Sequence, residues 1–179
     1  KSENMKLWIL GPADEDEKYA KECYDLVESL GVKDVEFTGR VNVRDYLGKM
    51  DFTLLTSISE GQPLTILESY AAHKPVITTD VGNCRELIYG NEDGFGDAGI
   101  LTHIMNIEEI AHAMVNMSIN EENRKRMGEA GYKRVNAFYR IDQMKDVYRE
   151  IYKGFSDSQN LSWTEESFKI NGHYSNPRK

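Results

Sequence analysis

The sequence contains only two cysteines, no long hydrophobic run and no excess of basic residues. Cys23 and Cys84 lack the spacing of a metal or redox motif, so we expect a reducing, cytoplasmic compartment. No apolar run approaches the roughly 20 residues of a membrane span, and no secretory hydrophobic stretch stands at the amino end. A formal charge of −8 and a pI near 5.1 argue against a nucleic-acid partner, because such a protein needs a basic face to meet the phosphates.

What the sequence does contain is enough for one domain. Its 179 residues, 40% of them hydrophobic, can bury a core without metal or disulfide staples. Short β-branched or aromatic runs alternate with helical patterns, which is typical of an α/β fold with a parallel sheet flanked by helices. The patterns predict strands at residues 6–10, 35–38, 52–56, 75–79 and 100–102, and helices at 15–30, 43–50, 64–72, 107–119, 121–139 and 141–155.

The pattern changes near the carboxyl end. We expect the domain to cover residues 1–155 and an irregular or flexible tail to occupy residues 156–179, because sustained periodicity stops there. Trp163 and Phe168 leave open a tail that docks on the domain.

The segment 52–72 carries the candidate chemistry, as a strand, a short loop and a helix. In a doubly wound fold, ligands bind at the carboxyl ends of the strands, where this loop is expected. Gly61 lets a ligand approach the backbone, and Pro63 suits the first helical position. The free amides of Leu64 and Thr65 then point out of the helix start, where the helix dipole favours an anion such as a phosphate.

Two carboxylates frame this turn, Glu60 before the helix and Glu68 within it. Helical periodicity places Glu68 with Thr65 and Ser69 on the arc opposite the apolar residues, so Glu68 is not obliged to be buried. A carboxylate there can accept two hydrogen bonds from a ribose, and Glu60 could do the same for a hexose or stabilise positive charge at a reacting carbon. The alternative is that Glu60 only favours the positive helix end and Glu68 is a solvated surface residue.

The run SISEGQPLTILESYAAHKPVITTDVG resembles the signature of the family 4 glycosyltransferases, which have two Rossmann-like halves in the GT-B arrangement. The resemblance extends over roughly residues 5–152, through LWILGPADED, VEFTGRVNVRDYL, CRELI, GILT and MGEAGYKRV. Gln62 and the CRELI run are most similar to the PelF-like branch, which is associated with exopolysaccharide assembly from UDP-glucose. The resemblance implies a Rossmann-like domain that corresponds to the nucleotide-sugar-binding, C-terminal half of a GT-B fold.

The resemblance also implies roles for individual residues around the donor sugar. Glu60, the catalytic candidate, matches the first motif glutamate, which contacts the donor sugar near its anomeric carbon. Glu68 matches the second glutamate, which holds the ribose hydroxyls. The backbone of Gly61 and Gln62 would line the sugar.

The remaining matches concern the diphosphate and the base. The amides of Leu64 and Thr65 would meet the diphosphate, and the turn with Arg40 and Val41 lies where such proteins hold the base. Family members retain the anomeric configuration and usually need no catalytic metal, so we expect a UDP-sugar donor substrate, no metal and no further cofactor. Electrostatic stabilisation of the leaving diphosphate would carry much of the rate enhancement.

The sequence departs from the family pattern in two places. Most relatives have glycine where His73 stands, so this position is expected to need a left-handed backbone. The Arg and Lys that bind the diphosphate in the family, and the acceptor-binding N-terminal half, have no counterpart before Lys6. We therefore interpret the chain as half of an enzyme, with a glycan acceptor held by the other half and with peripheral association to a membrane polysaccharide complex left open.

Other motifs are interpreted as structural. The Gly-rich run 94–99 spells a dinucleotide fingerprint but precedes a strand, so it is expected to be a flexible loop. Lys133 and Arg134 are assigned to a solvated helix face, and Cys84 to an inert buried thiol.

The sequence thus predicts the donor-binding half of a retaining glycosyltransferase, inactive on its own. A nucleotide-sugar-binding module without turnover is the alternative. A sugar-nucleotide epimerase of GT-B architecture fits the two halves but not the glutamate pair.

Overall fold

The computed structural model describes the backbone of residues 5–157 and the side chains of residues 5–154. Strands and helices alternate along most of this length, as the sequence predicts. The strands are β1 (Leu7–Leu10), β2 (Val35–Gly39), β3 (Thr53–Leu55), β4 (Val76–Thr79) and β5 (Gly99–Thr102). The helices are α1 (Glu17–Ser29), α2 (Arg44–Leu47), α3 (Leu64–Ala71), α4 (Cys84–Tyr89), α5 (Ile107–Ile119), α6 (Glu121–Phe138) and α7 (Ile141–Asp157).

All strand pairs are parallel, but they form two sheets. One sheet pairs β1 with β2, and the other has the order β3-β4-β5. Strand β4 lies in the middle of the second sheet, with Ile77 opposite Leu54 on one side and Ile100 on the other. Its four residues are all buried, which suits a β-branched strand covered on both faces. The fold is the expected Rossmann-like one, with parallel sheets flanked by helices.

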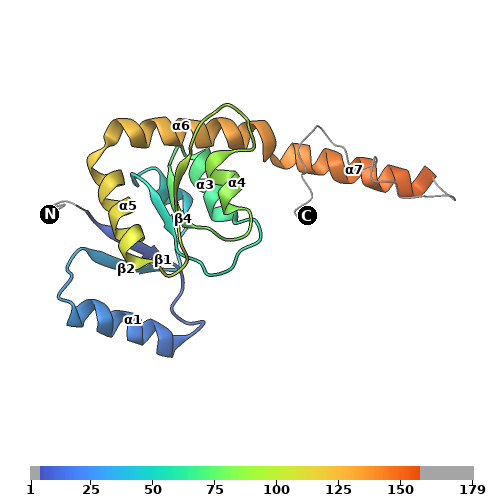
Figure 1. Ribbon diagram of the computed structural model, residues 1–179. Coiled ribbons are helices and arrows are strands. Elements are labelled where there is room, and N and C mark those ends of the chain that lie inside the picture. Colours follow the sequence, from blue (N-terminus) through green and yellow to red (C-terminus); the bar gives the residue numbers. More distant parts are fainter. Residues whose placement is uncertain (1–4, 158–179) are drawn as a thin grey trace.

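The core lies on both faces of β4, because successive side chains of a strand point in opposite directions. Val76 packs on one face in a cluster with residues of α3, α4 and α6, among them Ile66, Tyr70 and Leu87. Ile77 packs on the other face with residues of α5 and α6, namely Ala113, Met117 and Met127. Helix α6 contributes to both clusters and therefore joins the two helical layers (Figure 1).

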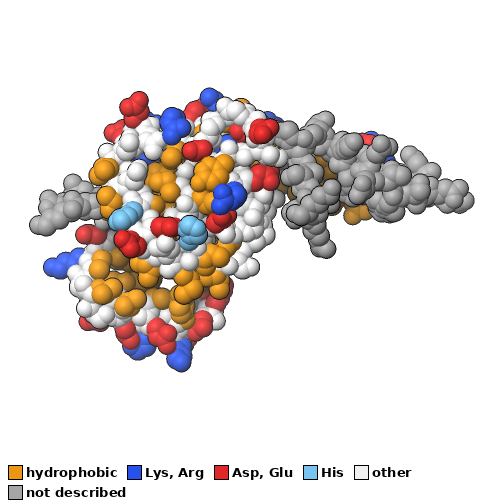
Figure 2. Space-filling view, viewed as in Figure 1, with side chains coloured by type: hydrophobic (Ala, Val, Ile, Leu, Met, Phe, Trp, Pro, Cys, Tyr) orange, Lys and Arg blue, Asp and Glu red, His pale blue; other side chains and the backbone are white. Residues whose placement is uncertain are grey.

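The first part of the chain forms a separate unit of β1, α1 and β2, seen below the body in Figure 1. None of the described residues up to residue 50 is buried. Helix α1 leaves Tyr19, Leu26 and Leu30 exposed. On the side of the molecule shown in Figure 2, hydrophobic side chains are visible over both the β1–α1–β2 unit and the body.

Helix α3 ends against α6. His73 follows the helix with a φ of 56°, the left-handed conformation that the sequence resemblance predicts at this position. Its ring stacks on Tyr132 with 3.7 Å between ring centroids, and its Nδ1 lies 3.2 Å from a carboxylate oxygen of Glu129. Gly128 permits this approach, because a Cβ there would overlap the His73 carbonyl oxygen. The carboxyl end of α3 is therefore fixed by its fit to α6.

Helix α7 leaves the body as a projecting arm (Figure 1). It ends at Asp157, and the rest of the tail expected at residues 156–179 lies outside the described residues. Between residues 5 and 157, no helix has the length and apolar character needed to cross a membrane.

Candidate functional site

The candidate loop runs from the end of β3 to the start of α3, where the sequence places it. Glu60 is partly buried within it, whereas Gly61 and Gln62 are exposed. The Ser57 hydroxyl donates a hydrogen bond of 2.7 Å to Oε1 of Glu60. Thr79, the last residue of β4, donates its hydroxyl hydrogen bond to the Ser57 carbonyl. The carboxyl ends of two neighbouring strands thus meet at this loop.

The start of α3 faces outward beside the loop. Pro63 occupies the N-cap position, one residue before the place expected for it, and a proline side chain cannot cap the helix with a hydrogen bond. Leu64 and Thr65 are exposed, and their amides begin the helix without an intrahelical acceptor. This end of α3 can therefore accept an anion.

Glu68 is exposed on α3, as helical periodicity predicts. The same prediction is wrong for Ser69, which is buried and shares a hydrogen bond of 2.8 Å with the Thr53 hydroxyl. A short polar side chain can be buried there because β3 offers it a partner. Glu60 and Glu68 thus stand on one loop and the helix that it enters.

The turn after β4 closes one side of the loop. The Asn83 amide donates a 2.9 Å hydrogen bond to the Gly61 carbonyl. Gly82, in a left-handed conformation with a φ of 50°, packs directly on the backbone of Glu60 and Gly61. A Cβ at Gly82 would overlap both carbonyl oxygens.

Arg40 and Val41 follow β2 and so belong to the separate two-stranded sheet. Within the described part of the chain, no hydrogen bond or ion pair joins them to residues 57–68. Six of the eight candidate residues therefore share one loop and helix, and the other two belong to another unit. Their role in holding a base stays a prediction.

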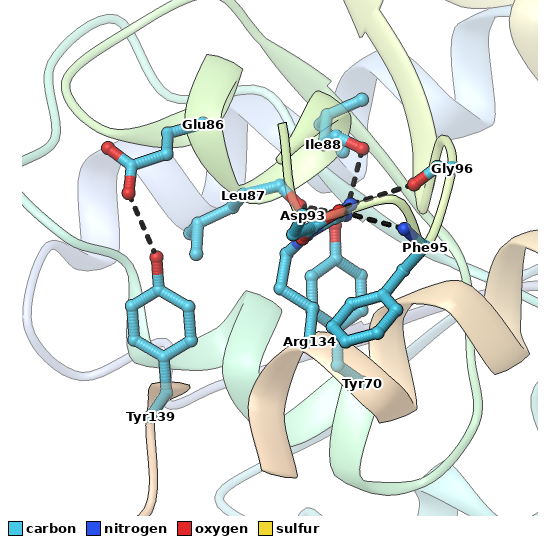
Figure 3. Close-up of polar contacts among 9 residues, drawn as sticks. All are labelled: Tyr70, Glu86, Leu87, Ile88, Asp93, Phe95, Gly96, Arg134 and Tyr139. Carbon is cyan, nitrogen blue, oxygen red and sulfur yellow. Dashed lines mark hydrogen bonds and ion pairs between the residues drawn. The ribbon is translucent and has the colours of Figure 1, made fainter. Parts of the chain in front are cut away.

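Arg134 is buried, so its assignment to a solvated helix face is wrong. Its side chain is 1% exposed and pairs with Asp93, itself 3% exposed, at 2.6 Å between Nε and Oδ2. The guanidinium also donates to the carbonyls of Leu87, Ile88 and Gly96 (Figure 3). Arg134 thereby ties α6 to the last turn of α4 and to the Gly-rich loop.

The surroundings shift the pKa values of groups near Arg134. Burial alone would raise the pKa of Asp93, but hydrogen bonds from Arg134 and from the Phe95 amide outweigh it and lower the pKa. Burial raises the pKa of Tyr70, whose hydroxyl donates to the Leu87 carbonyl. Burial and the Glu86 carboxylate raise the pKa of Tyr139 to about 12. The cluster therefore holds an ionised pair beside two neutral phenols.

A groove of about 1010 Å³ begins at the candidate loop and continues to the base of α7. Gln62, Leu64 and Leu67 line it at the loop end, and Tyr139 and Met144 are among the residues on the α7 side. The candidate loop thus borders an open space on its outer side.

The other motifs form no second centre among the described residues. The Gly-rich run leads into β5 rather than into a helix, as expected. Cys84 is buried, also as expected. Residues 5–154 contain no group of three or more His, Cys, Asp or Glu side chains placed to hold a metal ion.

The family described as Glycosyl transferases group 1 matches residues 1–134, most of the chain. The chain belongs to this glycosyltransferase family. The candidate loop, both framing glutamates and the turn that closes the loop lie within the matched range.

Two members of the family are similar to this chain over most of its length. An uncharacterized glycosyltransferase of Methanocaldococcus jannaschii is 29% identical over 145 residues, which cover 79% of this chain and 40% of that protein. The N-acetyl-α-D-glucosaminyl L-malate synthase of Bacillus anthracis is 32% identical over 129 residues, covering 71% of this chain and 32% of that enzyme. The chain therefore spans about two fifths or less of these relatives.

Solved structures confirm the fold of the glycosyltransferase chain. HepE of Anabaena, in complex with UDP-glucose, has a TM-score of 0.73 at 21% identity, with 83% of this chain and 41% of that chain covered. The sucrose-phosphate synthase of Thermosynechococcus elongatus has a TM-score of 0.71 at 20% identity, with 83% and 39% covered. The C-terminal domain of a Francisella tularensis group 1 glycosyltransferase has a TM-score of 0.62 at 25% identity, with 71% and 65% covered.

Three residues that support the candidate loop were not predicted from the sequence. Ser57 holds Glu60 from within the loop, and Gly82 and Asn83 contact the loop from the turn after β4, although none was singled out as a site residue. A signal was present for Gly82, because the loops after adjacent parallel strands meet at one sheet edge. Arg134 gave no such signal, since its partner Asp93 lies 41 residues away in the sequence.

Proposed function

We propose that this chain is the donor-binding, C-terminal half of a retaining glycosyltransferase. The enzyme would transfer a hexose, glucose, from UDP-glucose to a glycan acceptor in exopolysaccharide synthesis. The observation that carries the proposal is the open start of α3, which stands between the Glu60 loop and the exposed Glu68. This arrangement offers one anion site with a carboxylate on either side of it.

The proposed chemistry follows from these groups. The amides of Leu64 and Thr65 would receive the diphosphate, whose negative charge grows as it leaves the sugar. Glu68 would accept hydrogen bonds from the ribose hydroxyls. Glu60, held toward the loop by Ser57, would contact the sugar near its anomeric carbon.

The proposal also assigns the base and the sugar. The turn with Arg40 and Val41 would hold the uracil, so the bound nucleotide would span the distance between the two sheets. The backbone of Gly61 and Gln62 would line the hexose. No metal or additional cofactor is assigned, because the α3 amides would supply the positive potential that the diphosphate needs.

The comparisons support a half-enzyme of this kind. The neighbour HepE was solved with UDP-glucose, and another neighbour is the C-terminal domain of a group 1 glycosyltransferase. The relatives are more than twice as long as the part that this chain matches. We therefore assign the glycan acceptor to the part of the enzyme beyond this chain, and leave open a peripheral association of the enzyme with a membrane polysaccharide complex.

Calorimetric titration with UDP and UDP-glucose tests the proposal. Glu68→Ala should weaken UDP binding several-fold, because the ribose loses its carboxylate partner. Glu122→Ala is the matched control, since Glu122 is an exposed helix residue at the start of α6. Unchanged UDP binding by Glu68→Ala would show that the ribose assignment is wrong.

The alternative is a module that binds nucleotide sugar without turnover. It is favoured for this chain alone because the chain matches only 40% and 32% of the two relatives. A transfer assay with labelled UDP-glucose separates the two. We expect the 179-residue chain to bind UDP but transfer no glucose. Transfer to any glycan acceptor would contradict the assignment of the acceptor site to another domain.

A further inference from the structure

The geometry points to Gly82 and Ser57 as positioning residues that together fix Glu60 for donor binding. Gly82 sets the place of the Glu60 backbone, and Ser57 sets the direction of the Glu60 carboxylate. The inference rests on the proposed function, in which Glu60 contacts the donor sugar. It assigns the two residues no contact with the donor itself.

Gly82 fixes the backbone of the candidate loop by close contact. The carbonyl oxygens of Glu60 and Gly61 lie so close to Gly82 that a Cβ there would overlap both. The next residue, Asn83, holds the Gly61 carbonyl through its amide at 2.9 Å. A side chain at Gly82 would therefore push the loop outward and break this hydrogen bond, because the neighbouring atoms are backbone and cannot rotate away.

Ser57 fixes the side chain of Glu60. The Ser57 hydroxyl donates to Oε1 of Glu60 at 2.7 Å, and Thr79 in turn holds the Ser57 carbonyl. Among the described residues, Ser57 is the hydrogen-bond partner of the Glu60 carboxylate, so Oε2 faces no competing donor. Glu60 is thus fixed at one oxygen and open at the other. A carboxylate held this way loses less conformational freedom when a sugar hydroxyl binds it.

The rest of the loop needs these contacts because its own side chains give little support. Ile58 is 70% exposed, and Ser59 and Gln62 are exposed as well. Burial therefore does not hold the middle of the loop. The contact with Thr79 comes from the buried end of β4, and the contacts with Gly82 and Asn83 come from the turn that follows this strand.

Gly82→Ala tests the backbone part, with Gly94→Ala as its matched control. Both glycines have a left-handed backbone, with φ values of 50° and 73°, so alanine is strained at both. Only at Gly82 does the Cβ meet other atoms, since nothing lies within 4 Å of a Cβ at Gly94. Ser57→Ala tests the side-chain part, and Ser59→Ala, in the same loop, is its control.

The binding readout is the ratio of the UDP affinity to the UDP-glucose affinity, measured by calorimetry. Glu60 is assigned to the sugar, so Gly82→Ala and Ser57→Ala should shift this ratio against UDP-glucose by about tenfold, the effect of one lost polar contact. The controls should keep the ratio of the unaltered chain. A loss of overall stability alone would lower the folded fraction but leave the ratio unchanged.

A second readout needs no ligand. Hydrogen exchange of the Asn83 amide, followed by NMR in the free protein, should become faster in Gly82→Ala and stay unchanged in Gly94→Ala. Equal exchange in both variants would overturn the role of Gly82 whether or not a nucleotide binds. A normal affinity ratio in Ser57→Ala would overturn the role of Ser57. If the unaltered chain binds neither nucleotide, the proposed function fails, and a donor-positioning role for these residues fails with it.

Discussion

The unit formed by residues 5–50 and the body formed by residues 51–139 differ in how their parallel strands are stabilised. Strand β1 pairs with β2 through backbone hydrogen bonds, yet no residue of that unit is buried. Strand β4 has the same length as β1, but all four of its residues are buried between two helical layers. The two units share the strand–helix–strand pattern and differ in what covers it.

The sequence pattern of a βαβ unit therefore does not by itself produce a core. In the body, α3, α4 and α6 pack on one face of β4 while α5 covers the other. In the first unit, α1 is amphipathic but its side chains remain exposed or partly exposed. Because apolar burial supplies most of the folding free energy, the body should account for nearly all of the stability.

The largest expected effect comes from the buried ion pair of the body. Arg134→Met should lower the free energy of unfolding by about 3–5 kcal/mol, because Asp93 stays buried without its partner. Thermal unfolding of the variant measures this loss. Lys133→Ala, at the exposed neighbouring position, should lower it by less than about 1 kcal/mol. Similar losses in both variants would mean that the pair does not hold the body together.

The next effect compares one isoleucine from each unit. Ile77→Ala in β4 removes a fully buried side chain and should lower the free energy of unfolding by about 2–5 kcal/mol. Ile9→Ala in β1 removes a side chain that is 40% exposed, so the loss should be smaller, because less apolar area returns to water. Urea unfolding of both variants gives the comparison. Equal losses would remove the distinction drawn between the two sheets.

Acid should affect the body more than the first unit. The pKa of Asp93 is lowered in the folded protein, so its contribution is complete above the unfolded value of about 3.9 and is lost as the pH falls through the folded value. Melting temperatures measured from pH 7 down to about pH 3 should fall more steeply for the unaltered chain than for Asp93→Asn, which cannot titrate there.

Glu36 provides the control from the first unit. Hydrogen bonds from Lys6 and Trp8 also lower its pKa, but it is exposed. Glu36→Gln should therefore leave the fall of the melting temperature at acid pH almost unchanged, because solvent screens exposed pairs. An equally strong dependence of the acid melting temperature on Glu36 and on Asp93 would contradict the difference between the two units.

The smallest effect concerns single hydroxyl groups. Tyr70→Phe removes the hydrogen bond to the Leu87 carbonyl and should lower the free energy of unfolding by about 1 kcal/mol. The loss is small because Arg134 still donates to that carbonyl. Tyr46→Phe in the first unit, where the ring contacts Trp8 edge-on, should change the free energy of unfolding by less than about 0.5 kcal/mol. Chemical denaturation resolves the difference.

Most of the fold could be predicted from the sequence because its elements show strong local periodicity. The helix expected at residues 107–119 has those bounds, and the five strands occur within two residues of their expected positions. The division into two sheets could not be predicted, because it depends on which strands pair. That choice is made by tertiary contacts rather than by the strands' own residues.

The location of most candidate residues on one loop and helix could be predicted in the same way, whereas their roles stay predictions. Glu60 and Glu68 could be found because the loop and helix that carry them are continuous in the sequence. The exposed Glu68 was predicted correctly, but Ser69 was not, because its partner Thr53 lies on a strand 16 residues earlier. Arg134 was assigned to the surface for the same reason, since a buried arginine is recognisable only with its distant carboxylate.

The contact between Gly128 and the His73 carbonyl limits which sequence changes this fold can accept. Any side chain at Gly128 would press on the carboxyl end of α3, whose other end begins at the candidate loop. An eight-residue helix carries such a displacement over roughly 12 Å. A natural variant at Gly128 would therefore displace the candidate loop although it contacts α3 at its far end.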